Sequence, residues 1–83
     1  MTREELHEAV MNTPGTKRRK LLSMRYGFYD GKRYSREEVA EEFGITVERV
    51  IQVEREFVRK VIEPLMDRKL LDELRKRHDE SNG

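Results

Sequence analysis

Two polar residues that can read a base pair, Glu48 and Gln52, lie four positions apart within the stretch VERVIQVER. In a helix this spacing places both on one face, together with Val47 and Ile51. A glutamine amide can pair with adenine through two hydrogen bonds, and a glutamate can accept one from cytosine N4. The two apolar residues can contact a thymine methyl group or another apolar surface. The chemistry of this face is recognition of base edges, although the apolar pair also leaves a protein interface, or loss of DNA reading, open.

Basic residues around the same segment can reach phosphates. They are Arg25, Arg36, Arg49, Arg55, Arg59 and Lys60. Each is equally consistent with a solvated surface charge or with an i,i+4 partner of a nearby glutamate. The densest basic run, residues 17–20, lies where a helix would begin, and the helix dipole disfavours cations there. That run is either a solvated face or a site for phosphate or an acidic partner.

The residues from Ser35 to Val53 have the pattern of a helix-turn-helix. Ser35 and Glu38 form a capping box that starts a first helix. Gly44 then ends that helix, because glycine adopts positive φ at little cost, and Thr46 is a good N-cap for a second helix. The buried stripe of the second helix is predicted to be Val50, Val53, Phe57 and Val61. Such a pair places its second helix in the DNA major groove, but it also occurs as a plain corner in small bundles.

The remaining elements also have helical patterns, so the expected fold class is all-α, a small bundle of about five helices. A single domain is expected over residues 1–83, with an N-terminal helix at 1–12 and the helix-turn-helix core and C-terminal helix at 16–77. Residues 78–83 are expected to be a frayed tail. Pro64 either kinks the long helix or starts a new one. The final apolar stripe either closes the core or leaves a groove for a partner helix, and consists of Met66, Leu70, Leu71 and Leu74.

Composition excludes several classes of protein. The chain has 83 residues, of which 35% are hydrophobic and 42% charged, and it has no cysteine for a disulfide or a thiolate metal site. Its charged beginning and the lack of a long apolar run exclude a signal peptide and a membrane span, and favour the cytoplasm. His7 and His78 lie near opposite ends, and no glycine-rich phosphate loop is present. We therefore expect no enzymatic activity, no cofactor and no bound metal.

The charge balance limits how strongly this chain can attract DNA. The net charge is +1, and residues 31–60 carry seven basic and seven acidic side chains. A DNA-binding domain that acts alone usually has a clear basic surface. Binding to DNA by this domain alone is therefore expected to be weak, in the non-specific range of roughly 10⁻⁴ to 10⁻⁶ M. The balance predicts a module that works beside a larger partner.

From Leu21 to Leu74 the sequence resembles region 4 of primary bacterial sigma factors. The residues that carry the resemblance are Arg25-Tyr26-Gly27, Glu37-Glu38-Val39, Gly44-Ile45-Thr46, the stretch from Glu48 to Glu54, Arg59-Lys60 and Pro64. The resemblance implies a domain that reads the minus-35 element of promoters. It also implies docking on the flap-tip helix of the RNA polymerase β subunit.

The resemblance assigns roles to residues as well. Glu48 and Gln52 stand where the family contacts bases, beside Val47 and Ile51. Contacts with the DNA backbone fall to Arg25, Ser35 and Glu37, in addition to the arginines Arg36, Arg49 and Arg55. The second helix and the segment after Pro64 stand where the family clasps the flap, here through Phe57, Val61, Leu70, Leu71 and Leu74.

Four positions depart from the family pattern, since Val47, Ile51, Glu56 and Ile62 replace cationic residues. Each lost phosphate contact weakens binding and lowers its salt dependence. The domain is expected either to read a sequence other than the consensus minus-35 element, or to regulate polymerase with little sequence-specific DNA contact, as a co-activator or a competitor for the flap. If Met1 is the natural start, a second protein would have to supply promoter melting, the function of sigma region 2.

Overall fold

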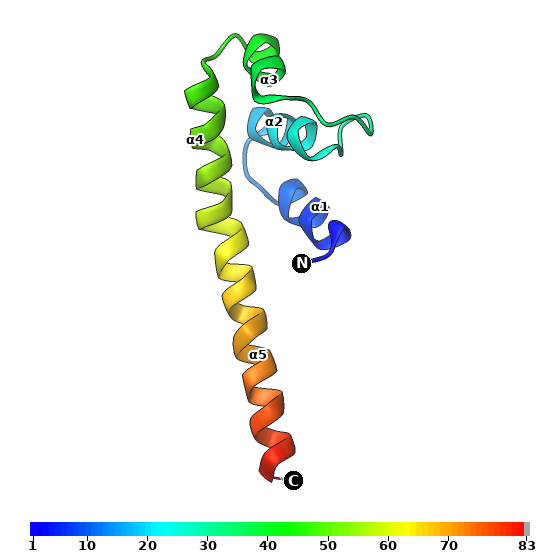
Figure 1. Ribbon diagram of the computed structural model, residues 1–83, viewed down its shortest axis with the longest axis vertical. Coiled ribbons are helices and arrows are strands. Elements are labelled where there is room, and N and C mark those ends of the chain that lie inside the picture. The colour runs from blue at the N-terminus through cyan, green and yellow to red at the C-terminus, as the bar shows by residue number, and fades with distance from the viewer. Residues whose placement is uncertain (83) are drawn as a thin grey trace.

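The computed structural model describes the backbone of residues 1–82 and the side chains of residues 1–75. The elements are α1 (Arg3–Met11), α2 (Thr16–Tyr26), α3 (Arg36–Phe43), α4 (Val47–Phe57), a π-helical turn η1 (Val58–Ile62) and α5 (Glu63–Asn82). Figure 1 shows α1, α2 and α3 gathered beside the upper part of a long rod made by α4, η1 and α5. The described part of the chain has no strand, which confirms the all-α prediction. Because the rod is uninterrupted, four separate helices replace the expected five.

The helix boundaries follow from local sequence signals. Thr2 with Glu5, and Ser35 with Glu38, both form capping boxes at the starts of α1 and α3. Gly27 ends α2 at a φ of 83°, and Gly44 ends α3 at 62°. A side chain at such positive φ would be strained, so glycine fits both ends.

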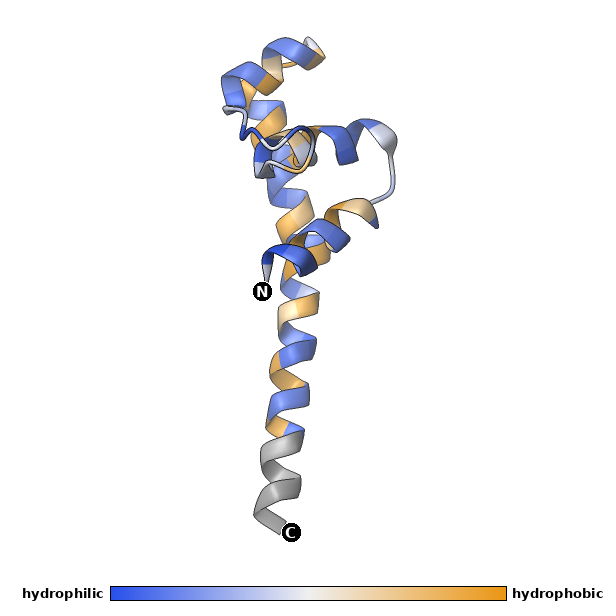
Figure 2. Cartoon of the chain, turned by 90° about the vertical axis from the view of Figure 1, so that its right-hand side faces the viewer, coloured by the Kyte–Doolittle hydropathy of each residue, from blue (hydrophilic) through white to orange (hydrophobic). Residues whose placement is uncertain are grey.

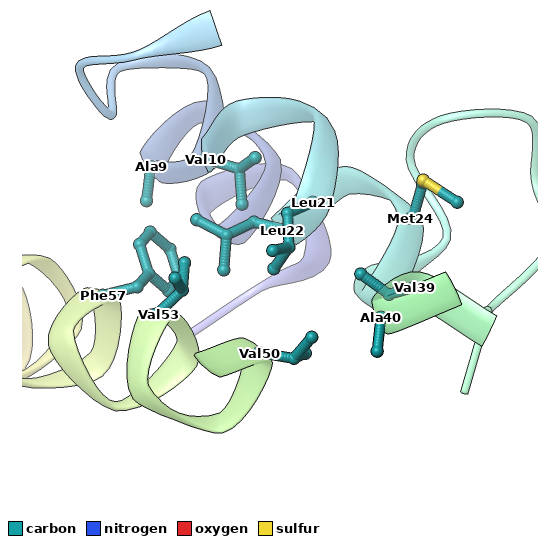
Figure 3. Close-up of a cluster of buried hydrophobic side chains, with 10 residues drawn as sticks. All are labelled: Ala9, Val10, Leu21, Leu22, Met24, Val39, Ala40, Val50, Val53 and Phe57. Atoms are coloured by element: carbon teal, nitrogen blue, oxygen red, sulfur yellow. The ribbon is translucent and has the colours of Figure 1, made fainter. Parts of the chain in front are cut away.

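The core lies between the three short helices and α4 (Figure 3). Figure 3 shows Val53 and Phe57 of α4 turned toward Ala9 of α1 and Leu22 of α2. The buried hydrophobic residues are Ala9, Val10, Leu21, Leu22, Met24, Val39, Ala40, Val50, Val53 and Phe57. The core therefore ends at Phe57, and we call residues 3–57 the head.

The rod passes through Pro64 without a break. Proline has no N–H to donate to the carbonyl of Lys60, and its ring crowds that carbonyl. The π-helical turn η1 ends at Ile62, two residues before Pro64, and such a wider turn is a common way for a helix to accommodate local disruption. Pro64 is the second residue of α5 and starts no separate helix.

The expected end of the last helix near Arg77 is wrong, because α5 continues to Asn82. No glycine or proline lies between Pro64 and Asn82, so nothing in the sequence stops the helix earlier. The backbone of the predicted tail, residues 78–83, is accordingly helical as far as Asn82, and Gly83 lies outside the described residues.

The stripe on α5 does not close the core, which corrects one of the two interpretations given above. Its residues remain exposed, at 52% for Met66, 56% for Leu70, 57% for Leu71 and 51% for Leu74. An ion pair between Lys69 and Glu5 ties α5 to α1. Beyond that point the rod extends away from the head (Figure 1), which gives extents of 57 × 23 × 19 Å.

Candidate nucleic-acid interface

The turn between α3 and α4 is short, and three hydrogen bonds define its conformation. The N–H of Gly44 donates to the carbonyl of Glu41 at 3.2 Å, and the N–H of Ile45 donates to that of Ala40 at 3.0 Å. The hydroxyl of Thr46 then accepts from the N–H of Arg49 at 3.1 Å. These bonds end α3 and start α4 within three residues, so the predicted helix-turn-helix is present.

Helix α4 has one buried and one exposed face. Val50, Val53 and Phe57 point into the core, whereas Glu48 and Gln52 are exposed, as their spacing predicts. Arg49 and Arg55 are exposed beside them. The exposed face therefore combines hydrogen-bonding groups for base edges with cations for phosphates.

The two apolar residues of this face are less available than expected. Val47 is half-buried and packs against the core, and Ile51 is also half-buried. Only part of each side chain is free for a thymine methyl. A shallow hollow of about 950 Å³ runs along this face and is lined by Tyr26, Arg36, Glu48, Ile51, Gln52, Glu54, Arg55, Glu56, Val58, Arg59 and Glu63.

Gln52 is held by a neighbour on its own helix. The guanidinium of Arg49 donates to the side-chain carbonyl of Gln52 at 3.0 Å. This bond leaves the Gln52 amide N–H groups free and uses one of the two lone pairs of its oxygen. Two-point pairing with adenine needs one donor and one acceptor of the amide, so the second lone pair leaves that pairing possible.

Glu54 is a buried charged residue that the sequence pattern did not single out. It is 8% exposed on the buried side of α4 and accepts from Arg25 Nε at 2.5 Å and from Arg36 Nη2 at 3.1 Å. Arg25 also donates to the carbonyl of Tyr34 at 2.7 Å. A carboxylate this deep needs such partners to offset its lost hydration. Its position, four residues after Val50 and three before Phe57, could have indicated a buried ion pair.

This network engages two of the predicted phosphate contacts, Arg25 and Arg36. The Arg25 side chain is only 23% exposed and ties α2 to α4 and to the loop before α3. The Arg36 side chain keeps 46% of its surface exposed at the edge of the hollow. Arg25 is thus a structural residue in this conformation, whereas Arg36 can still reach a ligand.

The start of α3 carries the other two residues assigned to the DNA backbone. The Ser35 hydroxyl accepts from the N–H of Glu38 at 3.1 Å, and the N–H of Ser35 donates to the Glu38 carboxylate at 3.0 Å. The bond from the Ser35 N–H holds the pKa of Glu38 below its ordinary value. Glu37 is exposed in the first turn. The Ser35 oxygen is therefore committed to the helix cap.

The basic run at residues 17–20 is largely engaged within the chain. Arg18 lies 3.8 Å from Glu56, and Arg19 donates to the carbonyl of Thr13 at 3.0 Å. Lys20 lies 3.8 Å from Glu42 and sits over the rings of Tyr29 and Phe43. These contacts account for most of the cations at this helix start without an external phosphate.

The residues predicted to clasp the flap do not share one surface. Phe57 is 3% exposed and belongs to the core, so its assignment to a docking surface is corrected. Val61 is half-buried against the core. Leu70, Leu71 and Leu74 are exposed on α5.

Two further kinds of site were sought among the described residues. No group of three or more histidine, aspartate or glutamate side chains in that part of the chain is arranged to hold a metal ion. Nor does any helix there combine the length and apolar character needed to cross a membrane.

A family model described as sigma-70, region 4 matches residues 16–61. The chain belongs to this family. Its relatives include the RNA polymerase sigma factor SigA of Clostridium acetobutylicum, 38% identical over 74 residues, which cover 89% of this chain and 19% of the relative. SigA of Lactococcus lactis subsp. cremoris is 35% identical over 72 residues, 87% of this chain and 20% of the relative. SigA1 of Synechococcus elongatus is 38% identical over 64 residues, 77% of this chain and 16% of the relative. No solved structure matched.

The region 4 match has clear limits along the structure. It covers α2, α3 and α4 and ends within η1, so it includes the helix-turn-helix and the Glu54 network. Helices α1 and α5 lie outside it. The chain spans about a fifth of the length of the curated relatives it matches.

Proposed function

We propose that this region 4 domain binds minus-35-type promoter DNA through the exposed face of α4 and binds RNA polymerase through the β flap. The observation that carries the proposal is the exposed pair Glu48 and Gln52, placed on α4 by the turn at Gly44 in a domain of this family. The matched relatives are RNA polymerase sigma factors.

The DNA contacts divide into two classes. Gln52 and Glu48 read adenine and cytosine at base edges, and the exposed part of Ile51 meets a thymine methyl. Arg49 and Arg55 flank them and contact phosphates, which fixes the register of α4 in the major groove. Arg36 reaches the backbone from the start of α3, at the edge of the hollow.

The electrostatics favour weak, selective binding. Val47, Ile51, Glu56 and Ile62 replace cations of the family pattern, and Glu54 engages Arg25. Each missing phosphate contact lowers the slope of log affinity against log salt by about 0.9. The preferred site therefore differs from the consensus minus-35 element, and tight promoter binding needs polymerase as well.

Polymerase contact falls to the exposed leucines of α5. Leu70, Leu71 and Leu74 present apolar surface beyond the head, as an amphipathic helix does when it binds a groove or another helix. Phe57 is excluded from this contact because it fills the core.

One observation favours a second candidate, a polymerase-binding regulator with little sequence-specific DNA contact. In the bond between Arg49 and Gln52, Arg49, which is proposed to contact a phosphate, holds Gln52, which is proposed to read a base. If that bond persists near DNA, Arg49 has fewer free donors for a phosphate and Gln52 is less free to adjust to a base, so the helix-turn-helix would serve mainly as a scaffold.

The deciding experiment replaces Gln52 by alanine. Sites selected from random duplexes would first define the preferred sequence, and fluorescence anisotropy at fixed salt would then measure affinity. We expect Gln52→Ala to weaken the preferred site by about 1–3 kcal/mol and to relax specificity at one position. Glu41→Ala, an exposed change on α3, serves as the control and should leave affinity unchanged.

A pull-down with the isolated β flap completes the test. If Gln52→Ala binds DNA like the parent while the flap is still captured, the regulator is the correct function. If the parent captures no flap and selects no DNA sequence, both candidates are wrong.

A further inference from the structure

A second hollow, of about 510 Å³, lies where the start of α1 meets the end of α2 and the loop before α3. We call it the arginine hollow, because three arginines contribute to its lining. The lining residues that matter here are Arg3, Arg25, Tyr26, Arg33, Ser35 and Glu38. Figure 2 shows that the first turn of α1, beside the N-terminus, is hydrophilic.

Two of these arginines converge without a carboxylate between them. Arg3 Nη2 and Arg33 Nε lie 3.3 and 3.9 Å from the position that a Cβ on Gly27 would take. Among the described side chains, neither arginine forms an ion pair. Arg3 donates to the carbonyls of Tyr26 and Gly27 at 3.3 and 3.4 Å, which uses only part of its donors. Neighbouring guanidinium groups repel each other, and an anion bound to both would remove that repulsion.

The walls that carry the two arginines are held by packing within the head. The Arg3 guanidinium lies 4.6 Å from the centre of the Phe28 ring, and the His7 ring stacks on Phe28 at 4.6 Å. The N–H of Tyr34 donates to the carbonyl of Met24 at 2.9 Å, which ties the end of the loop to α2. Because both segments are already fixed to α2, little further ordering is needed to bind a ligand.

We propose that Arg3 and Arg33 together bind a phosphate of the DNA backbone, beside the groove that receives α4. Tyr26 lines both hollows, and Ser35 in this one is followed by Arg36 in the other, so the two sites adjoin at the start of α3. A guanidinium matches a phosphate through paired N–H bonds. The inference rests on the proposed function and adds to it a contact from α1, which lies outside the family match.

The charges around the arginine hollow suit a phosphate. Glu38 lines it as well, but its carboxylate accepts from the N–H of Ser35 at 3.0 Å and lies 3.6 Å from Lys32. The Glu38 charge is therefore partly neutralised, and the two arginines dominate the field in the hollow. An acidic peptide would satisfy the same charges, but the adjoining face of α4 favours a phosphate of the duplex that α4 binds.

The salt dependence of DNA affinity tests this contact. By fluorescence anisotropy on the preferred duplex, the double variant Arg3→Ala/Arg33→Ala should lower the slope of log affinity against log salt by about 0.9. Its loss of affinity between about 50 and 200 mM salt should thus be about 3.5-fold smaller than that of the parent. The preference over a scrambled duplex should not change, because a phosphate carries no sequence information.

Two further variants separate a paired contact from general attraction. Lys32→Ala removes the neighbouring positive charge, which does not line the hollow, and should change the slope by less than half as much. Arg33→Lys keeps the charge without the guanidinium fork and should recover part of the affinity that Arg33→Ala loses. Circular dichroism would confirm folding, since Arg3 also contacts the end of α2.

Neutral methylphosphonate linkages, introduced one at a time along the duplex backbone, locate the phosphate. The parent should lose affinity at a position where the double variant loses none, because both changes remove the same contact. Inorganic phosphate without DNA tests the other source of this anion. Saturable NMR shifts of the Arg33 side-chain N–H with phosphate, together with an unchanged salt slope in the double variant, would mean a site for free phosphate and overturn the proposal.

The failure of this inference can be told from failure of the proposed function. If Gln52→Ala loses specificity but the double variant keeps the parent slope, the arginine hollow does not bind DNA. If Lys32→Ala lowers the slope as much as the double variant, the paired contact is likewise wrong. If Gln52→Ala binds like the parent while the double variant still lowers the slope, base reading fails and the phosphate contact stands. A parent that binds no duplex overturns both.

Discussion

The head and α5 both carry apolar residues at helical spacing, but these residues have opposite environments. In the head, Leu22 is fully buried and the apolar residues of four helices meet. On α5, Leu70 has the same side chain and remains 56% exposed. The comparison teaches that helical spacing identifies which residues share a face, whereas the rest of the chain decides whether that face is covered.

The largest effect should come from truncating one leucine in each region. Leu22→Ala removes a fully buried side chain and is expected to lower the free energy of unfolding by about 3 kcal/mol. Leu70→Ala should lower it by less than about 0.5 kcal/mol, because little is buried there. Urea denaturation followed by circular dichroism would measure both at a low protein concentration. Equal losses would mean that α5 packs on the head in solution.

The next effect concerns charge inside the head. Glu54→Ala leaves Arg25 without its partner in a half-buried position, and we expect a loss of about 2 kcal/mol. The matched control is Glu56→Ala, whose pair with Arg18 is longer and more exposed, with an expected loss under about 1 kcal/mol. Thermal unfolding would rank the stabilities of the two variants. A Glu54 variant as stable as the control would mean that the network does not stabilise the fold.

A smaller effect is expected at the turn between α3 and α4. Gly44→Ala should cost about 1 kcal/mol, because a φ of 62° strains a residue with a Cβ. No atom lies within 4 Å of the added carbon, so the cost is conformational only. Gly44→Asn should therefore recover part of the loss, since asparagine tolerates this conformation better. Chemical denaturation would measure the free energy of unfolding of both variants. A loss well above this cost with either residue, as a steric clash would cause, would contradict this explanation.

The smallest effect is the dependence of the stability of the fold on pH in the acidic range. The bond from the Ser35 N–H keeps the pKa of Glu38 below its ordinary value of 4.5, and the hydrogen bond from Lys69 does the same for Glu5. A lowered pKa in the folded state means that the stabilisation is present above pH 4.5 and is lost as the pH falls through the folded-state value. The Glu38→Gln variant should show a shallower decline than the parent below pH 4.5 in thermal melts. An identical decline would mean that this carboxylate is not linked to folding.

Local signals predicted the head well. The capping boxes, the positive-φ glycines and the stripe of Val50, Val53 and Phe57 are all short-range patterns, and each appears as expected. Their physics involves residues within one or two helical turns, which a single sequence contains in full.

Long-range partners could not be predicted in the same way. Arg25 and Arg36 are of a residue type that often contacts phosphates. Glu54, on another helix, pairs with both of them. Phe57 fits either a core or a docking surface by spacing alone, and only the fold shows that it packs in the core, where its ring lies beside that of Tyr26 on α2. Pro64 is a helix breaker by propensity, and the π-helical turn before it was not visible in the pattern.

The uninterrupted rod also fixes the distance between α4 and the far end of α5. From Gln52 to Leu74 the helix rises about 33 Å, close to the length of one turn of B-DNA. Anything held at the far end is thus carried at a fixed distance from Gln52 and at a fixed rotational angle about the helix axis. Adding a single residue to η1 would lengthen this span by only about 1.5 Å but would turn the leucines of α5 by about 100° relative to Gln52.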